Sequence, residues 1–332
     1  MGDARPFLSV IVTSYSEDRL PDLFDLLASV KDQTYPHIEM LFVAERTPEL
    51  SERIREYAER LEMHNVTTLF NDGEPGLSAG RNVAIPRAKG EIIAFLDDDV
   101  VAFPDWAEAM VRTFAETDAI GLTGPALPLW EDPSMAWFPK ELYWIISCTA
   151  WSGLGQLREV RNAWGMNMAF RREAFSIAGL FHNATGYHVG PFAEDNEFSL
   201  RIRSETGKRI LYVPDAKVWH RVHRYRLTWS FVRERAYWIG RSRRNLSRVY
   251  AAGNSGGDLL SPERDLLGRI ITRRIPRDLA GLLRTPSLAW RRLSITFWAL
   301  AFVALGYYSH ILPGRNRVVA LRGSKRGETS GA

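Results

Sequence analysis

Ile92-Ile93-Ala94-Phe95-Leu96-Asp97-Asp98-Asp99 joins five apolar residues directly to three aspartates. A short apolar run of this kind predicts a buried β-strand. Side chains alternate between the two faces of a strand, so Asp97 and Asp99 would converge while Asp98 points elsewhere. Converging carboxylate oxygens suit Mg²⁺ or Mn²⁺, and ligands of parallel α/β sheets bind at the carboxyl ends of the strands. The stretch therefore predicts a divalent metal site that bridges an α/β sheet to a diphosphate.

An acidic turn is the alternative explanation of the three aspartates. Pro104 and the helical spacing of apolar residues from Asp105 to Phe114 indicate that a helix begins shortly after them. Acidic residues near a helix start can serve only to cap the helix. The rest of the chain has to decide between the two explanations.

Strand and helix patterns alternate along the residues that precede the aspartates. Apolar, β-branched runs predict strands, and apolar residues at helical spacing predict helices between them. Alternation at this spacing favours a parallel, doubly wound α/β sheet. The predicted strands are residues 7–13, 38–44, 66–70 and 92–96, and the predicted helices are residues 20–30, 49–61 and 78–87.

The pattern becomes irregular after the aspartates. Residues 121–165 are rich in Trp, Pro and Gly, which is typical of a binding surface beside a sheet rather than an extension of it. A linker of small residues is expected at residues 251–257. Further helices are predicted at residues 169–177, 195–204 and 227–250, and further strands at residues 209–213 and 216–219.

Composition indicates a globular chain with a basic C-terminal third. The 332 residues are 45% hydrophobic, enough for at least one large core. Arginine is dense between Arg221 and Arg326 and gives the chain its pI of about 9.2. This charge favours anionic partners such as phospholipid head groups or a lipid-linked phosphate. No nucleic-acid partner is expected, because the sequence has neither zinc-ligand spacing nor a base-stacking motif.

The compartment is expected to be reducing and the folded part to face the cytosol. Cys148 is the only cysteine, which excludes an intrachain disulfide and a multi-cysteine metal site. The first residues lead directly into the predicted strand at residue 7, without the apolar segment and cleavage site of a signal peptide. Both observations favour the cytosolic side of a membrane.

Residues 293–312 are mostly apolar and reach the lower length limit, about 20 residues, for a helix that crosses a bilayer. Arginines flank both ends, so the rule that relates positive charge to orientation gives no answer. The more polar second half, Gly306 to His310, suits a helix in the membrane interface or half of a re-entrant pair with residues 279–293. A buried core helix has the same signature. The segment predicts membrane association and leaves spanning, interfacial and buried positions open.

Six short motifs follow one another between residues 7 and 250. They are a strand and loop at residues 10–17, Gly-x-Ser-x-x-Arg-Asn at residues 76–82, Asp-x-Asp at residues 97–99, Gly-Met-Asn-Met-Ala-Phe-Arg at residues 165–171, the pair Glu194-Asp195, and His220. Together they resemble the inverting family 2 glycosyltransferases of the GT-A fold. Any one motif would be weak alone, but six in this order make the resemblance specific.

The resemblance implies a nucleotide-diphosphate sugar donor, with a UDP-sugar expected. Tyr15 would stack on the base and Thr13 would hydrogen-bond it, although a strand often ends in such an aromatic for structural reasons alone. Arg81 and Asn82 begin a helix after glycines, where backbone N–H groups and an arginine favour nucleotide phosphate or ribose, although such a stretch taken alone is more often only a loop and helix cap. Glu45 stands where the family usually has aspartate and would accept a hydrogen bond from the base. The implied donor-binding residues are Thr13, Tyr15, Glu17, Glu45, Arg81, Asn82, Asp97 and Asp98.

The resemblance also implies a catalytic base and an acceptor side. Inverting transfer needs a carboxylate that takes the proton from the attacking acceptor hydroxyl. Asp195 is the candidate base and Glu194 would orient nearby groups, whereas a helix N-cap is the structural alternative for Asp195. The implied acceptor side consists of Trp164, Gly165 and Asn167.

The metal site of the resemblance combines the aspartates with a histidine. Asp97, Asp99 and His220 would hold Mn²⁺ or Mg²⁺ against the donor diphosphate. His223 lies close in the sequence and is a rival for the same position.

These patterns together predict a membrane-associated, metal-dependent transferase with a GT-A-type, mostly parallel sheet and a helical C-terminal extension. The expected acceptor is a polyprenyl- or dolichyl-linked sugar or phosphate of cell-surface glycan or glycoprotein assembly. Extension of a soluble or surface polysaccharide is one alternative, and a non-catalytic nucleotide-sugar-binding scaffold is the other. The expected regions are a catalytic domain at residues 1–220 with a donor half (1–100) and an acceptor half (101–220), a basic aromatic helical region (221–292), a membrane segment (293–312) and a basic flexible tail (313–332).

Overall fold

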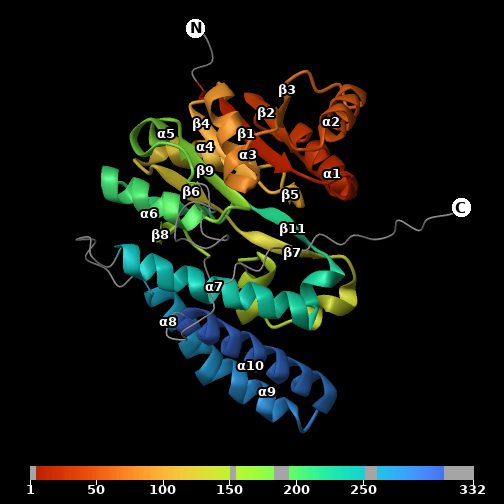
Figure 1. Ribbon diagram of the computed structural model, residues 1–332, viewed down its shortest axis with the longest axis vertical. Coiled ribbons are helices and arrows are strands. Elements are labelled where there is room, and N and C mark those ends of the chain that lie inside the picture. Colours follow the sequence, from red (N-terminus) through yellow and green to blue (C-terminus); the bar gives the residue numbers. More distant parts are fainter. Residues whose placement is uncertain (1–4, 150–154, 183–193, 251–259, 310–332) are drawn as a thin grey trace, which may run out of the picture.

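The protein is described by a computed structural model, which covers residues 5–149, 155–182, 194–250 and 260–309. Its N-terminal half forms four parallel strands separated by helices, as the sequence predicts (Figure 1). Every residue of the strand before the aspartates is buried, which explains its continuous apolar sequence. The four strands are β1 (Leu8–Ser14), β2 (Ile38–Glu45), β3 (Val66–Asn71) and β4 (Ile92–Leu96).

Helices cover both faces of these strands, and side-chain alternation divides the core between the faces. On β1, Val10 and Val12 belong to the cluster that packs against α1, α2 and α4, while Ile11 belongs to the cluster on the α3 face. Proline in the first turn of α1 and of α2 fixes the start of each helix. The helices are α1 (Leu20–Lys31), α2 (Pro48–Arg60), α3 (Leu77–Ala84) and α4 (Trp106–Glu116), with short 3₁₀ turns at Glu17–Arg19 and Ile85–Arg87.

The second half of the chain extends the same sheet. Strand β9 (Asn167–Arg171) pairs antiparallel with β4 and with β6 (Gly121–Thr123), and β10 (Ile210–Tyr212) then pairs with β6 and with the edge strand β8 (Arg158–Val160). The complete order is β3-β2-β1-β4-β9-β6-β10-β8. Parallel pairs predominate in the N-terminal half, in agreement with the predicted fold class.

Two predictions for this half are wrong. The helix predicted at residues 169–177 is instead strand β9 followed by the short helix α5 (Glu173–Ala178), because a brief apolar run buried on both faces has no helical or strand period. Residues 121–165 do not merely lie beside the sheet, since β6 and β8 belong to it. The same region also contains two 3₁₀ segments, Pro133–Trp137 and Lys140–Ile146.

A second, three-stranded sheet brings the late histidine to the aspartates. Strand β11 (Val218–Val222) runs antiparallel to β5 (Val100–Ala102) and parallel to β7 (Ala126–Trp130). In this register His220 lies opposite Val100, and the Arg221 amide donates to the Asp99 carbonyl at 2.8 Å. Residues more than a hundred positions apart in sequence thus meet at the carboxyl end of β4.

The C-terminal part is helical and lies against one end of the sheet structure (Figure 1). Helix α6 (Glu194–Thr206) packs with α5 on the main sheet, while α7 (Trp229–Tyr250) lies between the sheets and the last three helices. A 3₁₀ turn at Arg224–Leu227 precedes α7. The last helices are α8 (Ser261–Arg269), which continues through a π-helical turn (Ile270–Arg274) into α9 (Ile275–Gly281), and α10 (Pro286–Tyr308).

Helices α7 and α10 cross at unusually close range. A Cβ atom added to Gly240 would lie 2.1 Å from the Val303 carbonyl oxygen, and one added to Gly306 would lie 2.0 Å from the Tyr237 carbonyl oxygen. The two backbones are therefore in direct contact, which only glycine permits.

Helix α10 is the one helix of the described ranges that is long and apolar enough to cross a membrane. It begins at Pro286, before the predicted segment. Only 28% of its most apolar stretch is buried, which argues against a core helix. Trp290 is 67% exposed and Phe297 is 54% exposed. The predicted linker at residues 251–257 and the predicted tail at residues 313–332 lie outside the described residues.

Candidate active site

Two carboxylates and an imidazole gather at the carboxyl end of β4. Asp97, Asp99 and His220 each offer one ligand atom, and these atoms lie within 4.8 Å of one another. Asp98 points away from them, and its Oδ2 accepts a hydrogen bond from Ser14 Oγ at 2.6 Å. Asp97 is 30% exposed, whereas Asp99 and His220 are almost completely buried. Asp97 to Asp99 form the tight turn between β4 and β5, in which the Val100 amide donates to the Asp97 carbonyl at 3.3 Å, and this turn separates Asp98 from its neighbours. The β5–β11 pairing supplies the histidine.

Asp99 is held by cations as well as by the histidine. Its Oδ1 lies 3.3 Å from His220 Nε2, while its Oδ2 accepts from Arg226 Nη2 at 2.5 Å and lies 3.5 Å from Arg19 Nη1. Burial disfavours charge on Asp99, but His220, Arg226 and Arg19 together hold its pKa below the ordinary value. Asp99 is therefore a charged carboxylate fixed in one orientation.

The pKa values of the two neighbouring carboxylates, Asp97 and Asp98, are raised. Burial raises the pKa of Asp97 despite Arg81, and burial with the adjacent Asp99 raises the pKa of Asp98 to about 7. Burial lowers the pKa of His220 to about 4, so its imidazole is neutral, and its buried Nδ1 has no hydrogen-bond partner among the described residues. Neutral imidazole and clustered carboxylates are ligands for a divalent cation, so these residues fit Mn²⁺ or Mg²⁺.

Arg81 joins the metal cluster to the candidate base. Its guanidinium is buried, with Nη2 3.3 Å from Asp97 Oδ1 and Nη1 3.3 Å from Glu194 Oε1. Nη2 also donates to the Gly165 carbonyl at 3.0 Å. The sequence predicts a phosphate or ribose contact for Arg81, whereas the structure encloses it between two acidic side chains. A Cβ at position 165 would lie 3.3 Å from the Arg81 guanidinium, a tight contact, so glycine leaves room for Arg81 here.

Asp195 lies on the other side of Gly165. Its Oδ2 accepts from the Gly165 amide at 3.0 Å, and its Oδ1 accepts from the Asn196 amide at 2.7 Å. Burial, together with the adjacent Asp195, raises the pKa of Glu194 to about 7. Of the Glu-Asp pair, Asp195 lines the neighbouring cavity, whereas Glu194 pairs with the buried Arg81.

A hydrogen-bonded chain links Asp195 to α7 and α8. Asn196 Nδ2 donates to Asp195 Oδ1 at 2.8 Å, and Arg243 Nη1 donates to Asn196 Oδ1 at 3.0 Å. Because arginine only donates and a carboxylate only accepts, the Asn196 amide can take a single orientation. Glu263 pairs with Arg243 Nε at 2.6 Å and with Arg161 at 2.8 Å. The C-terminal helices thereby help to fix the side chain next to the candidate base.

The predicted nucleotide-binding residues lie at the ends of β1 and β2. Tyr15 is 64% exposed and Glu17 is exposed on the following 3₁₀ turn, while Thr13 is half-buried. Glu45 Oε1 accepts from the Gly76 amide at 2.9 Å and so joins β2 to the start of α3. Gly76 has φ of 126°, a conformation that favours glycine.

Some of the other residues that the sequence predicts for the site make structural hydrogen bonds within the fold. Asn82 exchanges two hydrogen bonds with the Phe181 backbone, at 2.8 and 3.0 Å. Asn167 is completely buried behind the predicted acceptor surface, where its amide bonds Trp106 Nε1 at 2.9 Å and the Ala216 carbonyl at 2.8 Å. His223 does not join the metal cluster, because its Nε2 lies 2.8 Å from Asp22 and its Nδ1 3.3 Å from Glu131.

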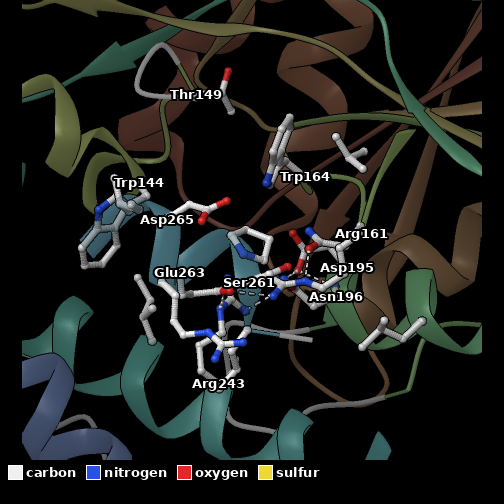
Figure 2. A pocket seen from close by; sticks show the side chains of 18 of the residues that line it. Trp144, Thr149, Arg161, Trp164, Asp195, Asn196, Arg243, Ser261, Glu263 and Asp265 are labelled. Carbon is white, nitrogen blue, oxygen red and sulfur yellow. Dashed lines mark hydrogen bonds and ion pairs between the residues drawn. The ribbon is translucent and has the colours of Figure 1, made fainter. Parts of the chain in front are cut away.

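A cavity of about 1650 Å³ adjoins Asp195 and extends between the sheet edge and the C-terminal helices. Figure 2 shows Asp195 and Asn196 beside Arg161, with Arg243 and Glu263 on the neighbouring wall. Trp164 also lines this cavity. Its ring and the ring of Tyr212 pack in a T-shaped arrangement, with their centroids 5.7 Å apart. Trp164 and Asp195 therefore share one surface, on the side expected for the acceptor.

Sequence reasoning missed four arginines and an asparagine of this site. Arg19 and Arg226 hold Asp99, and Arg235, Arg243 and Asn196 line the cavity next to Asp195. The arginine density after residue 221 was a signal for an anionic partner, but it could not show which side chains turn toward the site.

Comparison with known proteins agrees with this geometry. Residues 9–177 match the family model described as glycosyl transferase family 2. The chain is 30% identical over 310 residues to the glucosyl-dolichyl phosphate glucuronosyltransferase of Haloferax volcanii, a match that covers 92% of this chain and 96% of that protein. It is 25% identical to the succinoglycan biosynthesis protein ExoM of Rhizobium meliloti, over 71% of this chain and 74% of that protein.

Solved structures show the same fold at low sequence identity. A mannosyltransferase from Pyrobaculum calidifontis, in complex with GDP-Man and Mn²⁺, is similar with a TM-score of 0.61 and 19% identity, over 92% of this chain and 88% of that chain. GalNAc-T7 with UDP, GalNAc and Mn²⁺ is similar with a TM-score of 0.53 and 17% identity, over 80% of this chain and 54% of that chain. Fold and site define a GT-A glycosyltransferase. The chain belongs to glycosyl transferase family 2, so the predicted fold, family and enzyme class are confirmed.

Proposed function

We propose that the protein is a metal-dependent, inverting transferase that moves a sugar from a UDP-sugar to a polyprenyl- or dolichyl-linked acceptor at the cytosolic face of a membrane. The observation that carries the proposal is the Arg81–Gly165 link, which places the cluster of Asp97, Asp99 and His220 beside the candidate base Asp195. A donor diphosphate at the cluster and an acceptor hydroxyl at Asp195 would then meet across Gly165.

On the donor side, Tyr15 has an exposed ring that would stack on the base, and Asp97, Asp99 and His220 form the cluster at which the diphosphate would bind. These three residues would hold Mn²⁺ or Mg²⁺, which supplies positive charge against the leaving diphosphate. Arg81 keeps the Asp97 carboxylate in place from behind. The Mn²⁺ complexes of the two similar structures support a metal of this type.

On the acceptor side, Asp195 would take the proton from the attacking hydroxyl. The amides of Gly165 and Asn196 fix its two oxygens, and Glu194 stands behind it with a raised pKa. The H. volcanii relative, by its name, acts on glucosyl-dolichyl phosphate, which supports a lipid-linked sugar as the acceptor and a UDP-glucuronate donor as the first to examine. Helix α10 supports a membrane location for such an acceptor.

A panel of nucleotide sugars tests the proposal. Thermal unfolding is measured with UDP-glucuronate, UDP-glucose, UDP-N-acetylglucosamine and GDP-mannose, each with Mn²⁺ or with EDTA, because a ligand that binds only the native state raises its stability. We expect one UDP-sugar to raise the unfolding temperature when Mn²⁺ is present and not in EDTA. The same UDP-sugar should be hydrolysed slowly in the absence of acceptor. Stabilisation without any hydrolysis or transfer would favour the non-catalytic scaffold. Transfer to a soluble polysaccharide but not to a lipid-linked sugar would overturn the acceptor assignment.

A further inference from the structure

Asp195 receives hydrogen bonds on both of its carboxylate oxygens. Its Oδ1 accepts from the backbone amide of Asn196 at 2.7 Å and from the side-chain Nδ2 of the same residue at 2.8 Å. Its Oδ2 accepts from the Gly165 amide at 3.0 Å. An ionised carboxylate has about four acceptor positions, two on each oxygen. The donors among the described residues use both positions of Oδ1 and one of Oδ2, so the position that can take a proton is the second one on Oδ2.

Arg243 decides how the Asn196 side chain can donate. Asn196 is buried, and its Oδ1 accepts from Arg243 Nη1 at 3.0 Å. Because an arginine has only donors, the carbonyl end of the amide faces Arg243 and the NH₂ end faces Asp195. A cation on the carbonyl oxygen also polarises the amide, which strengthens the N–H donor at its other end. Arg243 therefore acts on Asp195 through the side chain of Asn196.

An acid of helix α8 fixes Arg243 in turn. Glu263 Oε1 lies 2.6 Å from Arg243 Nε, and two nitrogens of Arg161 each donate to the same carboxylate at 2.8 Å. Burial lowers the pKa of Arg243, while Glu263 favours its charged form. Figure 2 shows Arg243 and Glu263 on the wall beside Asn196 and Asp195. Helices α6, α7 and α8 thus meet in one chain of contacts that ends on the candidate base.

We propose that Arg243 is a positioning residue for the candidate base, and that it holds Asp195 through Asn196 so that Oδ2 takes the proton of the acceptor hydroxyl. The inference rests on the proposed function and adds to it the proton-accepting atom and the residue that orients this atom. As the proton moves to Oδ2, the acceptor oxygen forms its bond to the anomeric carbon, and the diphosphate leaves with the electron pair of the bond that breaks. Without Arg243 the Asn196 amide can turn its carbonyl oxygen toward Oδ1, and the carboxylate loses one of the donors that orient it.

A double-mutant cycle separates this role from a purely structural one. Release of UDP from UDP-glucuronate is measured with Mn²⁺, both with a short-chain glucosyl-polyprenyl phosphate in detergent as acceptor and with water alone. We expect Arg243→Gln to lower kcat at least about tenfold and to leave KM for the donor unchanged, because the metal cluster is not altered. In the Asp195→Asn background the same substitution should lower kcat less than about twofold, because no base is left to orient.

Further variants protect the test against misfolding of Arg243→Gln. Arg243→Lys keeps a charged donor and should be more active than Arg243→Gln. The double variant Arg243→Gln, Glu263→Gln also removes the acid that has lost its partner, so it should recover the unfolding temperature but not the turnover. Arg233, which is exposed on the same helix, gives the matched control, and Arg233→Gln should behave as the wild type.

The outcomes distinguish the inference from the proposed function. Equal losses of kcat in the wild-type and Asp195→Asn backgrounds, or turnover that returns together with the unfolding temperature, would overturn the inference and make Arg243 a structural residue. UDP release by the wild type would still support the proposed function in that case. Full turnover in Asp195→Asn would overturn the assignment of the base and the inference with it. A wild type that releases UDP from none of the UDP-sugars would overturn the proposed function itself, and the inference would fall with it.

Discussion

Asp99 combines a structural and a metal-binding position in one side chain. Arg226 and Arg19 pair with its Oδ2 atom, while His220 Nε2 lies beside its Oδ1 atom. In Asp99→Asn the neutral amide binds a divalent ion weakly. We expect kcat/KM for transfer to fall on the order of a thousandfold or more, which corresponds to a loss of several kcal/mol of transition-state stabilisation. Mn²⁺ titration of activity is the measurement, with the unfolding temperature as a check on folding. Full activity in the variant, or wild-type activity in EDTA, would contradict the metal site.

Asp195 can be tested by removing its charge while its shape is kept. Asp195→Asn keeps the shape of the side chain, but its amide nitrogen replaces one of the two oxygens that accept from the Gly165 and Asn196 amides, and it no longer accepts a proton. We expect turnover to fall at least about a hundredfold while stabilisation by donor and Mn²⁺ stays nearly intact. A variant with normal turnover and weakened donor binding would show that Asp195 only caps α6.

Glu194 predicts a specific dependence of stability on pH. Its pKa is raised from 4.5 to about 7 by burial and by Asp195, so the folded form keeps a proton that the unfolded form has already lost. Stability therefore falls as pH rises from about 5 to 7. Glu194→Gln removes this loss, and its free energy of unfolding relative to the wild type should rise between pH 5 and pH 8 by up to about 3 kcal/mol. Denaturant unfolding in EDTA at four pH values measures it, and a constant difference would show that Glu194 is charged throughout.

The sequence predicted that Asp97 and Asp99 converge while Asp98 points elsewhere. The structure has this arrangement, although the three residues form a turn after β4 rather than a continuation of the strand. The sequence could not predict that Arg81 turns inward to Asp97 and Glu194, because that contact depends on how α3, β4 and α6 pack. The roles of the site residues in catalysis stay predictions.

At the scale of elements, the strands and helices that precede the aspartates were predicted well, whereas strand β9 was not. Helix α4 and strand β4 match their patterns closely. Strand β9 was mistaken for helix because burial on both faces erases the period, and α10 begins before the apolar segment because Pro286 can start a helix. Partners across the sheet, such as β11 with β5, are set by tertiary packing and have no local signal.

The crossing of α7 and α10 gives a prediction with an unusual sign. Replacing glycine by alanine in an open helix position normally stabilises a protein by up to about 1 kcal/mol. Gly268→Ala in α8 should do so, since nothing lies within 4 Å of its added Cβ. Gly306→Ala should instead destabilise, because its Cβ meets the Tyr237 carbonyl oxygen and must push the helices apart. Denaturant unfolding of both variants measures the difference, and stabilisation by Gly306→Ala would contradict the close crossing.

At the scale of the whole molecule, α7 restricts how α10 meets a membrane. Helix α7 packs along α10 and carries five arginines between Arg233 and Arg244, so lowering α10 into hydrocarbon would carry these charges with it. We therefore expect α10 to lie in the interface rather than to span the bilayer. The exposed Trp290 and Phe297 would enter the head-group region.

Vesicle binding tests this arrangement. The double variant Trp290→Asp, Phe297→Asp should lose binding to neutral vesicles, because it removes the apolar contact. It should keep binding to anionic vesicles at low salt, since the arginines remain and their attraction is screened within about 10 Å only at 0.1 M salt. Co-sedimentation with both kinds of vesicle at low and high salt is the measurement. Unchanged binding to neutral vesicles would place the membrane contact elsewhere.

The backbone contacts of Gly240 with Val303 and of Gly306 with Tyr237 leave no layer of side chains between α7 and α10 at their crossing. We therefore expect α7 and α10 to move as one piece, so that Asp195 would keep a constant height above a membrane surface in which α10 rests. The lipid carrier of the proposed acceptor would be held in that same surface. We expect only a hydroxyl at a matching distance from the carrier phosphate to reach Asp195, so that the helix crossing would select carriers by how many sugars they already bear.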